Sequence, residues 1–308
     1  MLEASLPRLL QRLILLLQPM AIDPKQTRSG ITPTWCPGCG DHFILSAFNL
    51  ALKEMDIDFN DLLVVWGVGC AGNGADFIKV NAMHALHGRP LAVASGAKLA
   101  NPKLKVVVFG GDGDGYGIGL SHFIHTARRN FDLTYIVHNN QIYGLTTGQT
   151  SPTTEKGYCS KSTPSGVIEE PIKPLELAIS SDATFVARAY YKELQQMKDL
   201  LIRAMNHRGF SLVDVLQICP SFKRNNTEDW YEANVSELTE DSHDRSDKAA
   251  AWNKAHDKSR LWHGVFYEEP NKATYCDELK QLKGRTPVQM YRELDKPLSM
   301  KAVLDEYR

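Results

Sequence analysis

Two cysteines lie three positions apart in the segment TWCPGCGDHF, which runs from Thr34 to Phe43. Cys36 and Cys39 are separated by a proline and a glycine, and a second glycine follows them. A Cys-x-x-Cys pair serves zinc ribbons, thiol oxidoreductases and iron–sulfur clusters. The local spacing therefore identifies two candidate thiol ligands and leaves the kind of centre open among these three.

A second pair of motifs has the chemistry of a metal–phosphate site. The segment GGDGDGYGIG covers residues 110–119, and Asn140 of HNNQIYG lies 28 residues after Asp112. Glycines let the backbone approach a phosphate, while carboxylate and amide oxygens are hard ligands that suit Mg²⁺. Each motif alone is equally compatible with a simple turn. Because each follows an apolar run, the combination favours a shared metal–phosphate site.

These motifs need strands that end at one edge of a sheet. Apolar, β-rich runs occupy 62–69, 105–111, 133–140, 183–190 and 210–218. Between them, helical patterns cover 41–55, 118–130 and 192–209. Strands that alternate with helices predict an α/β fold, with a mostly parallel sheet flanked by helices and ligands at the carboxyl ends of the strands.

The composition is that of an ordinary globular protein. The 308 residues are 43% apolar, enough for one large core or two smaller ones, and the net charge is −1. This balance argues against nucleic acid or an anionic membrane as a partner. Six cysteines in a chain of this length do not suggest disulfide staples, so we expect a reduced, cytoplasmic setting.

Several motifs together resemble the thiamine-diphosphate-binding β subunit of 2-oxoacid:ferredoxin oxidoreductases, especially those of the 2-oxoglutarate type. Between about Ile22 and Phe222 they are WCPGCG, GVGCAG, HALHGR, GAKLANP, GDGDGYGIG, NNQIYGLTTGQTSPT and DVLQICP, with weaker similarity at WYEANV and GVFYEE. The resemblance implies a thiamine-diphosphate-binding fold. It also implies coenzyme A-dependent oxidative decarboxylation of a 2-oxoacid to acyl-CoA and CO2, with ferredoxin as the electron acceptor.

The resemblance also implies a cofactor site. Mg²⁺ would be held by the side chains of Asp112 and Asn140 and by the backbone carbonyl of Ile142. His87, in the HGR segment, is a candidate catalytic residue, although a hydrogen-bonded structural histidine would look the same. The positions that match cofactor contacts are Val68, Gly69, Cys70, Ala71, Gly113, Asp114, Gly144 and Leu145.

The same resemblance adds two further cysteines to Cys36 and Cys39 as cluster ligands. In the family, four thiolates bind one 4Fe–4S cluster, and the matching residues are Cys36, Cys39, Cys70 and Cys219. Soft thiolate ligands suit iron–sulfur chemistry, whereas a zinc ribbon needs two compact Cys pairs that the last two cysteines do not form. The remaining cysteines, Cys159 and Cys276, match nothing, and we expect no special role for them.

An α subunit is implied as partner, because in the family it supplies a catalytic carboxylate and much of the substrate pocket. The expected assembly is a heterodimer or a dimer of heterodimers. Many relatives have a basic residue after Cys-Ser-Gly, whereas this chain has Asn73 after Cys70-Ala71-Gly72. Lys79, Arg89 or a partner residue could supply the missing charge. Asn73 weakens the transfer of substrate preference from those relatives. The resemblance to the 2-oxoglutarate type implies 2-oxoglutarate as substrate, with pyruvate or a broad range of 2-oxoacids as the alternative.

Three parts are expected along the chain. Residues 1–21 form an N-terminal extension, and translation starting at Met20 is an alternative; residues 22–224 bind both cofactors; residues 225–308 form a helical tail. The stretch 146–174 has no helical or strand pattern, and so long a loop is either functional or disordered.

Two hypotheses from other classes remain open. A non-catalytic zinc or nucleic-acid-binding module would use Cys36 and Cys39, but the neutral charge and the Asp112–Asn140 spacing weigh against it. A thiamine-diphosphate decarboxylase or synthase without redox function would leave the four matched cysteines unexplained. Stoichiometric zinc, or iron with acid-labile sulfide, would separate the module from the oxidoreductase.

Overall fold

The structure is a computed structural model that describes residues 27–239, 243–282, 285–292, 301 and 304–305. The expected N-terminal extension and the alternative start at Met20 lie outside the described residues. In the part of the chain that is described, no helix is long and apolar enough to cross a membrane.

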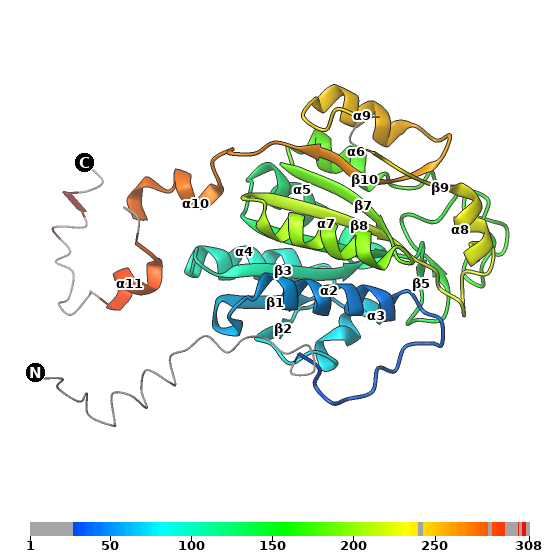
Figure 1. Cartoon of the computed structure of the whole chain (residues 1–308), viewed down its shortest axis with the longest axis horizontal. Helices are drawn as coiled ribbons and strands as arrows, with labels where there is room; N and C mark the ends of the chain where they lie inside the picture. Colours follow the sequence, from blue (N-terminus) through cyan, green and yellow to red (C-terminus); the bar gives the residue numbers. More distant parts are fainter. Residues whose placement is uncertain (1–26, 240–242, 283–284, 293–300, 302–303, 306–308) are drawn as a thin grey trace, which may run out of the picture.

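An eight-stranded sheet forms the centre of the molecule (Figure 1). Its order is β2-β1-β3-β4-β8-β7-β10-β9, and the first six of these strands run parallel to one another. The strands are β1 (Leu62–Trp66), β2 (Ala82–His84), β3 (Lys105–Gly111), β4 (Leu133–Asn139), β7 (Phe185–Tyr190), β8 (Phe210–Leu216), β9 (Val235–Glu237) and β10 (Leu261–Glu268). A separate antiparallel pair joins β5 (Ile142–Tyr143) to β6 (Gln149–Thr150). The predicted, mostly parallel α/β fold is confirmed.

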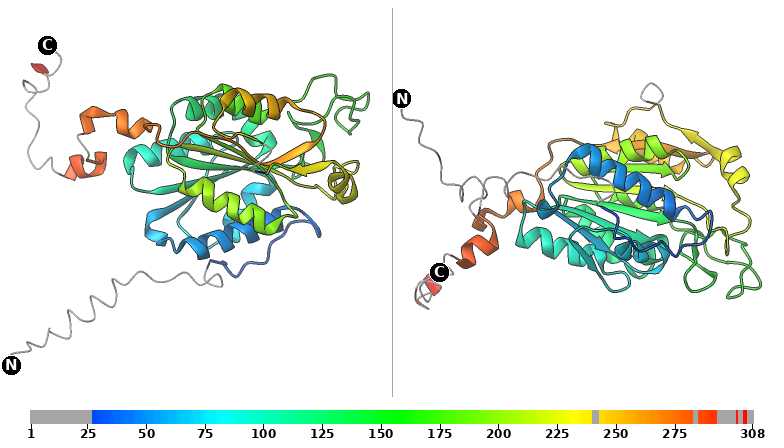
Figure 2. Two further views of the ribbon diagram at one scale, coloured as in Figure 1. Left: turned by 45° about the horizontal axis from the view of Figure 1, so that its top comes forward. Right: turned by 60° about the horizontal axis from the view of Figure 1, so that its bottom comes forward.

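Helices cover both faces of this sheet. Helices α2 and α7 lie side by side on one face, while α4, α5, α6 and α9 contribute to the core on the other (Figure 2). The α-helices are α2 (Asp41–Met55), α3 (Gly69–Gly72), α4 (Pro90–Ala100), α5 (Leu120–Arg128), α6 (Pro174–Ser180), α7 (Leu194–Asn206), α8 (Glu228–Asn234), α9 (Lys248–His256), α10 (Tyr275–Glu278) and α11 (Pro287–Arg292). Short 3-10 turns occupy Phe59–Asp61, Asn73–Asp76 and Lys280–Leu282.

The central strands are apolar along their whole length because both faces of the sheet are buried. In β1, the side chains of Val64 and Trp66 pack on the α2 side, whereas Val65 packs on the opposite side. The Trp66 ring stacks on Phe109 of β3, with 4.3 Å between ring centroids. Alternate residues therefore belong to two separate cores, as the unbroken apolar runs predicted.

The predicted elements are mostly confirmed in place and type. The helix over 41–55 and the strand over 105–111 have the observed bounds. The helix predicted over 118–130 is shorter, because a π-helical segment, η3 (Gly113–Ile118), precedes α5. Gly117 breaks the helical geometry there, with φ −88° and ψ −109°. The glycine-rich motif thus forms a turn of its own before the helix begins.

The prediction of a helical tail was incomplete. Helices α8 to α11 are present, but β10 also lies in this part of the chain and pairs antiparallel with β7. Its sequence signal is weak because Gly264, with φ +131°, and an irregularity between Val265 and Tyr267 interrupt the alternation of the strand. The strand forms because β7 offers an edge to pair with, which no local pattern reveals.

We expect Phe266→Ala to lower the free energy of unfolding by about 3–5 kcal/mol, because Phe266 is 1% exposed and fills the core beneath β10. Tyr291→Ala is the matched control, since Tyr291 lies in the same tail but is 78% exposed; its effect should stay within about 0.5 kcal/mol. Urea unfolding followed by circular dichroism measures both. Equal effects would show that β10 does not contribute to the core.

Candidate functional site

The loops that follow β1, β3 and β4 meet at one end of the sheet, the end away from α10 and α11 (Figure 1). They enclose a cavity of about 250 Å³. All eight predicted cofactor contacts line this cavity, and so do the predicted magnesium ligands and His87; the lining residues are Val68, Gly69, Cys70, Ala71, His87, Gly111, Asp112, Gly113, Asp114, His138, Asn140, Ile142, Tyr143, Gly144, Leu145, Thr146 and Gln217. Residues from distant parts of the sequence therefore face one space, and the role of each stays a prediction.

Asp112 lies directly after β3 and is 2% exposed. Its Oδ2 accepts hydrogen bonds from the hydroxyls of Ser151 and Thr153, each at 2.5 Å. Burial raises the pKa of Asp112 to about 6, while these two hydroxyls and the backbone N–H of Gly113 oppose the shift. A buried carboxylate held in this way is stabilised by a cation, since a cation offsets the cost of its charge.

Asn140 follows β4 and offers a second side-chain oxygen, besides those of Asp112, as a candidate metal ligand. Its Oδ1 accepts a hydrogen bond from the backbone N–H of Ile142 at 3.1 Å, which orders the turn and leaves the second lone pair of this oxygen for another contact. With Asp112, the site offers oxygen donors at the same cavity. This donor set fits Mg²⁺, a hard cation that prefers oxygen ligands.

The glycine at position 113 is required by a close approach. A Cβ atom there would lie 2.1 Å from the Tyr143 ring, and the Tyr143 hydroxyl donates to the Gly113 carbonyl at 3.0 Å. The turn after Asp112 and the turn after Asn140 therefore pack directly against each other. Any larger residue at this position would separate the two predicted ligands.

His87 and Asp114 form a pair at the cavity. The Nδ1 atom of His87 lies 2.7 Å from Asp114 Oδ1, and the backbone N–H of Gly88 donates to the same oxygen at 2.6 Å. Burial raises the pKa of Asp114, and the contacts to Gly88 and His87 act against this. The His87 side chain is 43% exposed, so the carboxylate fixes a ring that reaches solvent. A ring whose Nδ1–H bonds a carboxylate presents Nε2 as an acceptor.

Two of the predicted cluster ligands meet at the cavity wall. Cys70 lies in α3 after β1, and Cys219 follows β8. A Cβ atom added to Gly144 would lie 3.4 Å from the Cys70 sulfur and 3.5 Å from the Cys219 sulfur. Both thiols therefore face the same glycine of the cavity wall, and Cys70 also lines the cavity.

Cys36 and Cys39 lie beside this pair. The Ser221 hydroxyl donates to the Cys36 sulfur at 3.0 Å, and the Cys39 thiol donates to Asp41 Oδ2 at 3.2 Å. Burial raises the pKa of Cys70 to about 12, and the charges of Asp41, Cys219 and Cys36 add to the shift. All four cysteines thus lie near one another, although they come from three separate segments.

Cys219 is buried, and backbone N–H groups of its own turn face its sulfur. Burial raises the pKa of Cys219, and the backbone N–H groups of Phe222, Ser221 and Lys223 oppose it. Among the described residues, no three His, Cys, Asp or Glu side chains approach closely enough to hold one metal ion. A four-iron cluster binds one thiolate at each iron, so its ligands stand apart from one another. The assignment of the four cysteines to one 4Fe–4S cluster stays a prediction.

Other predicted residues lie elsewhere. Asn73, Lys79 and Arg89 are not among the residues that line the cavity. Cys159 is exposed, and Cys276 contacts the backbone of Lys98 with its thiol. That these two cysteines have no special role stays a prediction.

Sequence reasoning missed a buried polar group that borders the cavity. Asp41 Oδ1 lies 2.6 Å from His138 Nδ1 and accepts a hydrogen bond from the Gln217 amide at 3.0 Å. His138 and Gln217 both line the cavity. Their positions at the ends of β4 and β8 were the available signal, since polar residues that end apolar strands are candidates for a site.

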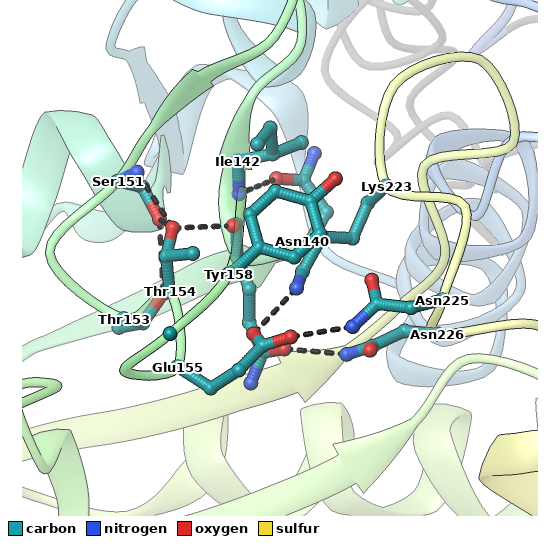
Figure 3. A network of polar contacts seen from close by, with 12 residues as sticks. Asn140, Ile142, Ser151, Thr153, Thr154, Glu155, Tyr158, Lys223, Asn225 and Asn226 are labelled. Atoms are coloured by element: carbon teal, nitrogen blue, oxygen red, sulfur yellow. Dashed lines mark hydrogen bonds and ion pairs between the residues drawn. The ribbon is translucent and has the colours of Figure 1, made fainter. Parts of the chain in front are cut away.

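The stretch 146–174 contributes hydroxyl groups that contact Asp112 at the cavity. Besides Ser151 and Thr153, its Thr154 hydroxyl donates to the Gln141 carbonyl at 2.7 Å, which holds the loop against the turn after β4 (Figure 3). The hydroxyl-rich run TSPTT was the signal for these contacts. Its partner, Asp112, could not be identified from the run alone.

Comparisons with known families agree with this geometry. Residues 67–215 match the family described as thiamine pyrophosphate enzyme, C-terminal TPP binding domain. Residues 219–284 match the family described as the C-terminal part of the pyruvate ferredoxin oxidoreductase beta subunit. The first match contains most of the cavity, and the second contains Cys219 and much of the tail.

Individual relatives match over most of the chain. The "2-oxoacid:ferredoxin oxidoreductase 1, subunit beta" of Aeropyrum pernix is 44% identical over 265 residues, which cover 82% of this chain and 83% of the relative. The "2-oxoglutarate synthase subunit KorB" of Archaeoglobus fulgidus is 43% identical over 64% of this chain and 74% of its own length.

A solved structure gives the same result. It is the "2-oxoglutarate:ferredoxin oxidoreductase from Magnetococcus marinus with 2-oxoglutarate, coenzyme A and succinyl-CoA bound", with a TM-score of 0.83 and 37% identity over 90% of this chain and 97% of the matched chain. This chain therefore belongs to the family of β subunits of 2-oxoacid:ferredoxin oxidoreductases.

Proposed function

We propose that this β subunit binds Mg²⁺–thiamine diphosphate and one 4Fe–4S cluster on opposite sides of a single wall. We further propose that, with an α subunit, it catalyses the coenzyme A-dependent oxidative decarboxylation of 2-oxoglutarate with ferredoxin as electron acceptor. The observation that carries the proposal is the position of Gly144. This glycine lines the cavity, and a Cβ atom added to it would lie 3.4 Å from the Cys70 sulfur and 3.5 Å from the Cys219 sulfur. Electrons then have only this wall to cross.

The role that we propose for the residues of the cavity is to hold Mg²⁺ and to orient thiamine diphosphate. Asp112, Asn140 and the Ile142 carbonyl would hold Mg²⁺, with the diphosphate beside the ion in the same cavity. Thiamine diphosphate, when bound, supplies the electron sink that decarboxylation of a 2-oxoacid requires. The protein's part is to fix the ion and to place the reacting end of the cofactor near the thiol side of the wall.

His87 is the proposed catalytic residue of this chain. Asp114 fixes its ring through Nδ1, so that Nε2 can hold or accept a proton at the cavity. The half-exposed position of the ring suits a contact with a substrate that enters from outside. A purely structural histidine would not need to border the cavity.

The assignment of 2-oxoglutarate is supported by the relatives. KorB is named for 2-oxoglutarate, and the solved structure contains 2-oxoglutarate and coenzyme A. Because Asn73, Lys79 and Arg89 do not line the cavity, we expect the α subunit to supply the positive charge for the second carboxylate. Other 2-oxoacids, pyruvate included, are the second candidate, since the Aeropyrum relative is named for 2-oxoacids in general. Rates with a panel of 2-oxoacids, coenzyme A and a viologen acceptor distinguish the two.

A partner over the mouth of the cavity is supported by exposed apolar side chains. Leu145 lines the cavity and is 55% exposed; Leu86, next to His87, is 79% exposed; and Ile118, which contacts Gly88, is 55% exposed. Apolar side chains grouped around a site mark a surface that another protein covers. We propose the α subunit for this surface, ferredoxin as the external acceptor, and the cytoplasm as the setting.

Asp112→Ala should weaken Mg²⁺-dependent binding of thiamine diphosphate at least about tenfold, because it removes the charged ligand of the ion. Asn140→Ala should have a smaller effect, since a neutral oxygen contributes less. Calorimetric titration of the purified enzyme with thiamine diphosphate, with Mg²⁺ and with a chelator, measures both. Wild-type affinity in Asp112→Ala would refute the metal assignment.

A single cysteine-to-serine substitution in the predicted cluster site should remove most of the iron, the acid-labile sulfide and the brown absorbance, because a hydroxyl replaces a soft sulfur ligand poorly. The four positions to substitute are Cys36, Cys39, Cys70 and Cys219. Cys159→Ser and Cys276→Ser are matched controls and should change none of these. All six substitutions are nearly isosteric, so a general packing defect would not separate four from two. Full iron and sulfide content in Cys219→Ser would contradict the four-ligand site.

A further inference from the structure

We propose that the ion pair between Lys223 and Glu155 couples the two prosthetic groups, so that binding of the cluster strengthens binding of Mg²⁺–thiamine diphosphate. The inference rests on the proposed function, because it requires both groups to bind this chain. The pair joins two segments: the cluster loop, residues 219–226, and the hydroxyl loop, residues 151–158.

The pair lies between the two loops (Figure 3). The Lys223 ammonium contacts Glu155 Oε2, and the Tyr158 ring centroid lies 3.7 Å from the same nitrogen. The Lys223 side chain is 0% exposed, whereas that of Glu155 is 41% exposed. A buried ammonium without a partner is strongly unfavourable, so Lys223 requires Glu155 and holds it in place.

Further contacts join the loops around this pair. The Asn225 amide donates to Glu155 Oε1, and the Tyr158 hydroxyl donates to the Phe222 carbonyl at 3.0 Å. The Asn226 amide donates to Gln141 Oε1 at 2.5 Å, which ties the cluster loop to the turn after Asn140 as well (Figure 3). The two loops therefore move as one unit while the pair is intact.

The hydroxyl loop connects the ion pair to the proposed magnesium site. Glu155 directly follows Thr154, whose hydroxyl accepts from the Ser151 backbone N–H at 2.8 Å and donates to the Gln141 carbonyl. Ser151 and Thr153 in turn donate to Asp112. Release of Glu155 would loosen the hydroxyls that orient the charged ligand of Mg²⁺.

The cluster loop connects the ion pair to Cys219, one of the proposed cluster ligands. The Lys223 backbone N–H donates to the Cys219 carbonyl at 3.1 Å, and N–H groups of the same turn face the Cys219 sulfur. A cluster bound at Cys219 fixes this turn and with it the position of Lys223. By thermodynamic linkage, the coupling is reciprocal: each group raises the affinity for the other by the same factor.

The test uses the complete enzyme purified without oxygen. The dissociation constant of Mg²⁺–thiamine diphosphate is measured with the cluster in place and after its removal by a chelator, which is itself removed before Mg²⁺ is added back. In the wild type we expect cluster removal to weaken binding at least about fivefold, the lower end of usual coupling factors. In Glu155→Ala, binding should already be weaker with the cluster present, and cluster removal should then add little.

Glu170→Ala is the matched control. It breaks the ion pair between Lys156 and Glu170, which lies at 2.8 Å on the same long loop but is largely exposed on both sides. Its coupling factor should equal that of the wild type. Because Cys70 itself lines the cavity, loss of the cluster could weaken thiamine diphosphate binding directly through that residue. The Glu155→Ala variant separates this direct effect from an effect through the ion pair.

Two results would overturn the inference. One is a wild-type affinity for thiamine diphosphate that does not change on cluster removal; the other is a wild-type coupling factor in Glu155→Ala. Asn225→Ala, which keeps the ion pair but removes a bond to Glu155, should lower the coupling factor less and guards against misfolding of the first variant. An enzyme without iron or without thiamine diphosphate would instead contradict the proposed function itself.

Discussion

The parallel arrangement of β1, β3, β4 and β8 fixes where the chemistry of this subunit takes place. Parallel strands deliver their following loops to the same edge of the sheet, so Cys70, Asp112, Asn140 and Cys219 meet although they lie far apart in the sequence. The strands stay in register because both faces are filled with large apolar side chains. The two prosthetic groups that we propose share one wall as a consequence of this topology.

Buried charge is the cost of such a site, and the chain offsets it with hydrogen bonds. Asp112 is held by two hydroxyls, and Asp41 accepts bonds from His138, Gln217 and the Cys39 thiol. These donors stabilise carboxylates that would otherwise be protonated or expelled to water. The two groups of bonds meet at Asn139, whose Oδ1 accepts from Thr153 and whose backbone carbonyl accepts from the Gln217 N–H.

The sequence was sufficient for the parts of the site that follow directly from strands. The GDG and NN turns were predictable because glycine, aspartate and asparagine end apolar runs there, and the four cysteines were predictable from the family resemblance. Strand β10 was not, because its pairing with β7 depends on tertiary contacts. Nor was the bond from Lys223 to Glu155, whose partners lie 68 residues apart in two loops without periodicity.

In the arrangement that we propose, a cluster and a magnesium-bound cofactor lie on either side of Gly144. The most direct measurement is anomalous diffraction at the iron edge from crystals of the complete enzyme, grown without oxygen in the presence of Mg²⁺ and thiamine diphosphate. We expect one iron peak enclosed by the sulfurs of Cys36, Cys39, Cys70 and Cys219, with density for the ion and the diphosphate at Asp112 and Asn140. Iron bound elsewhere, or zinc held by Cys36 and Cys39 alone, would contradict it.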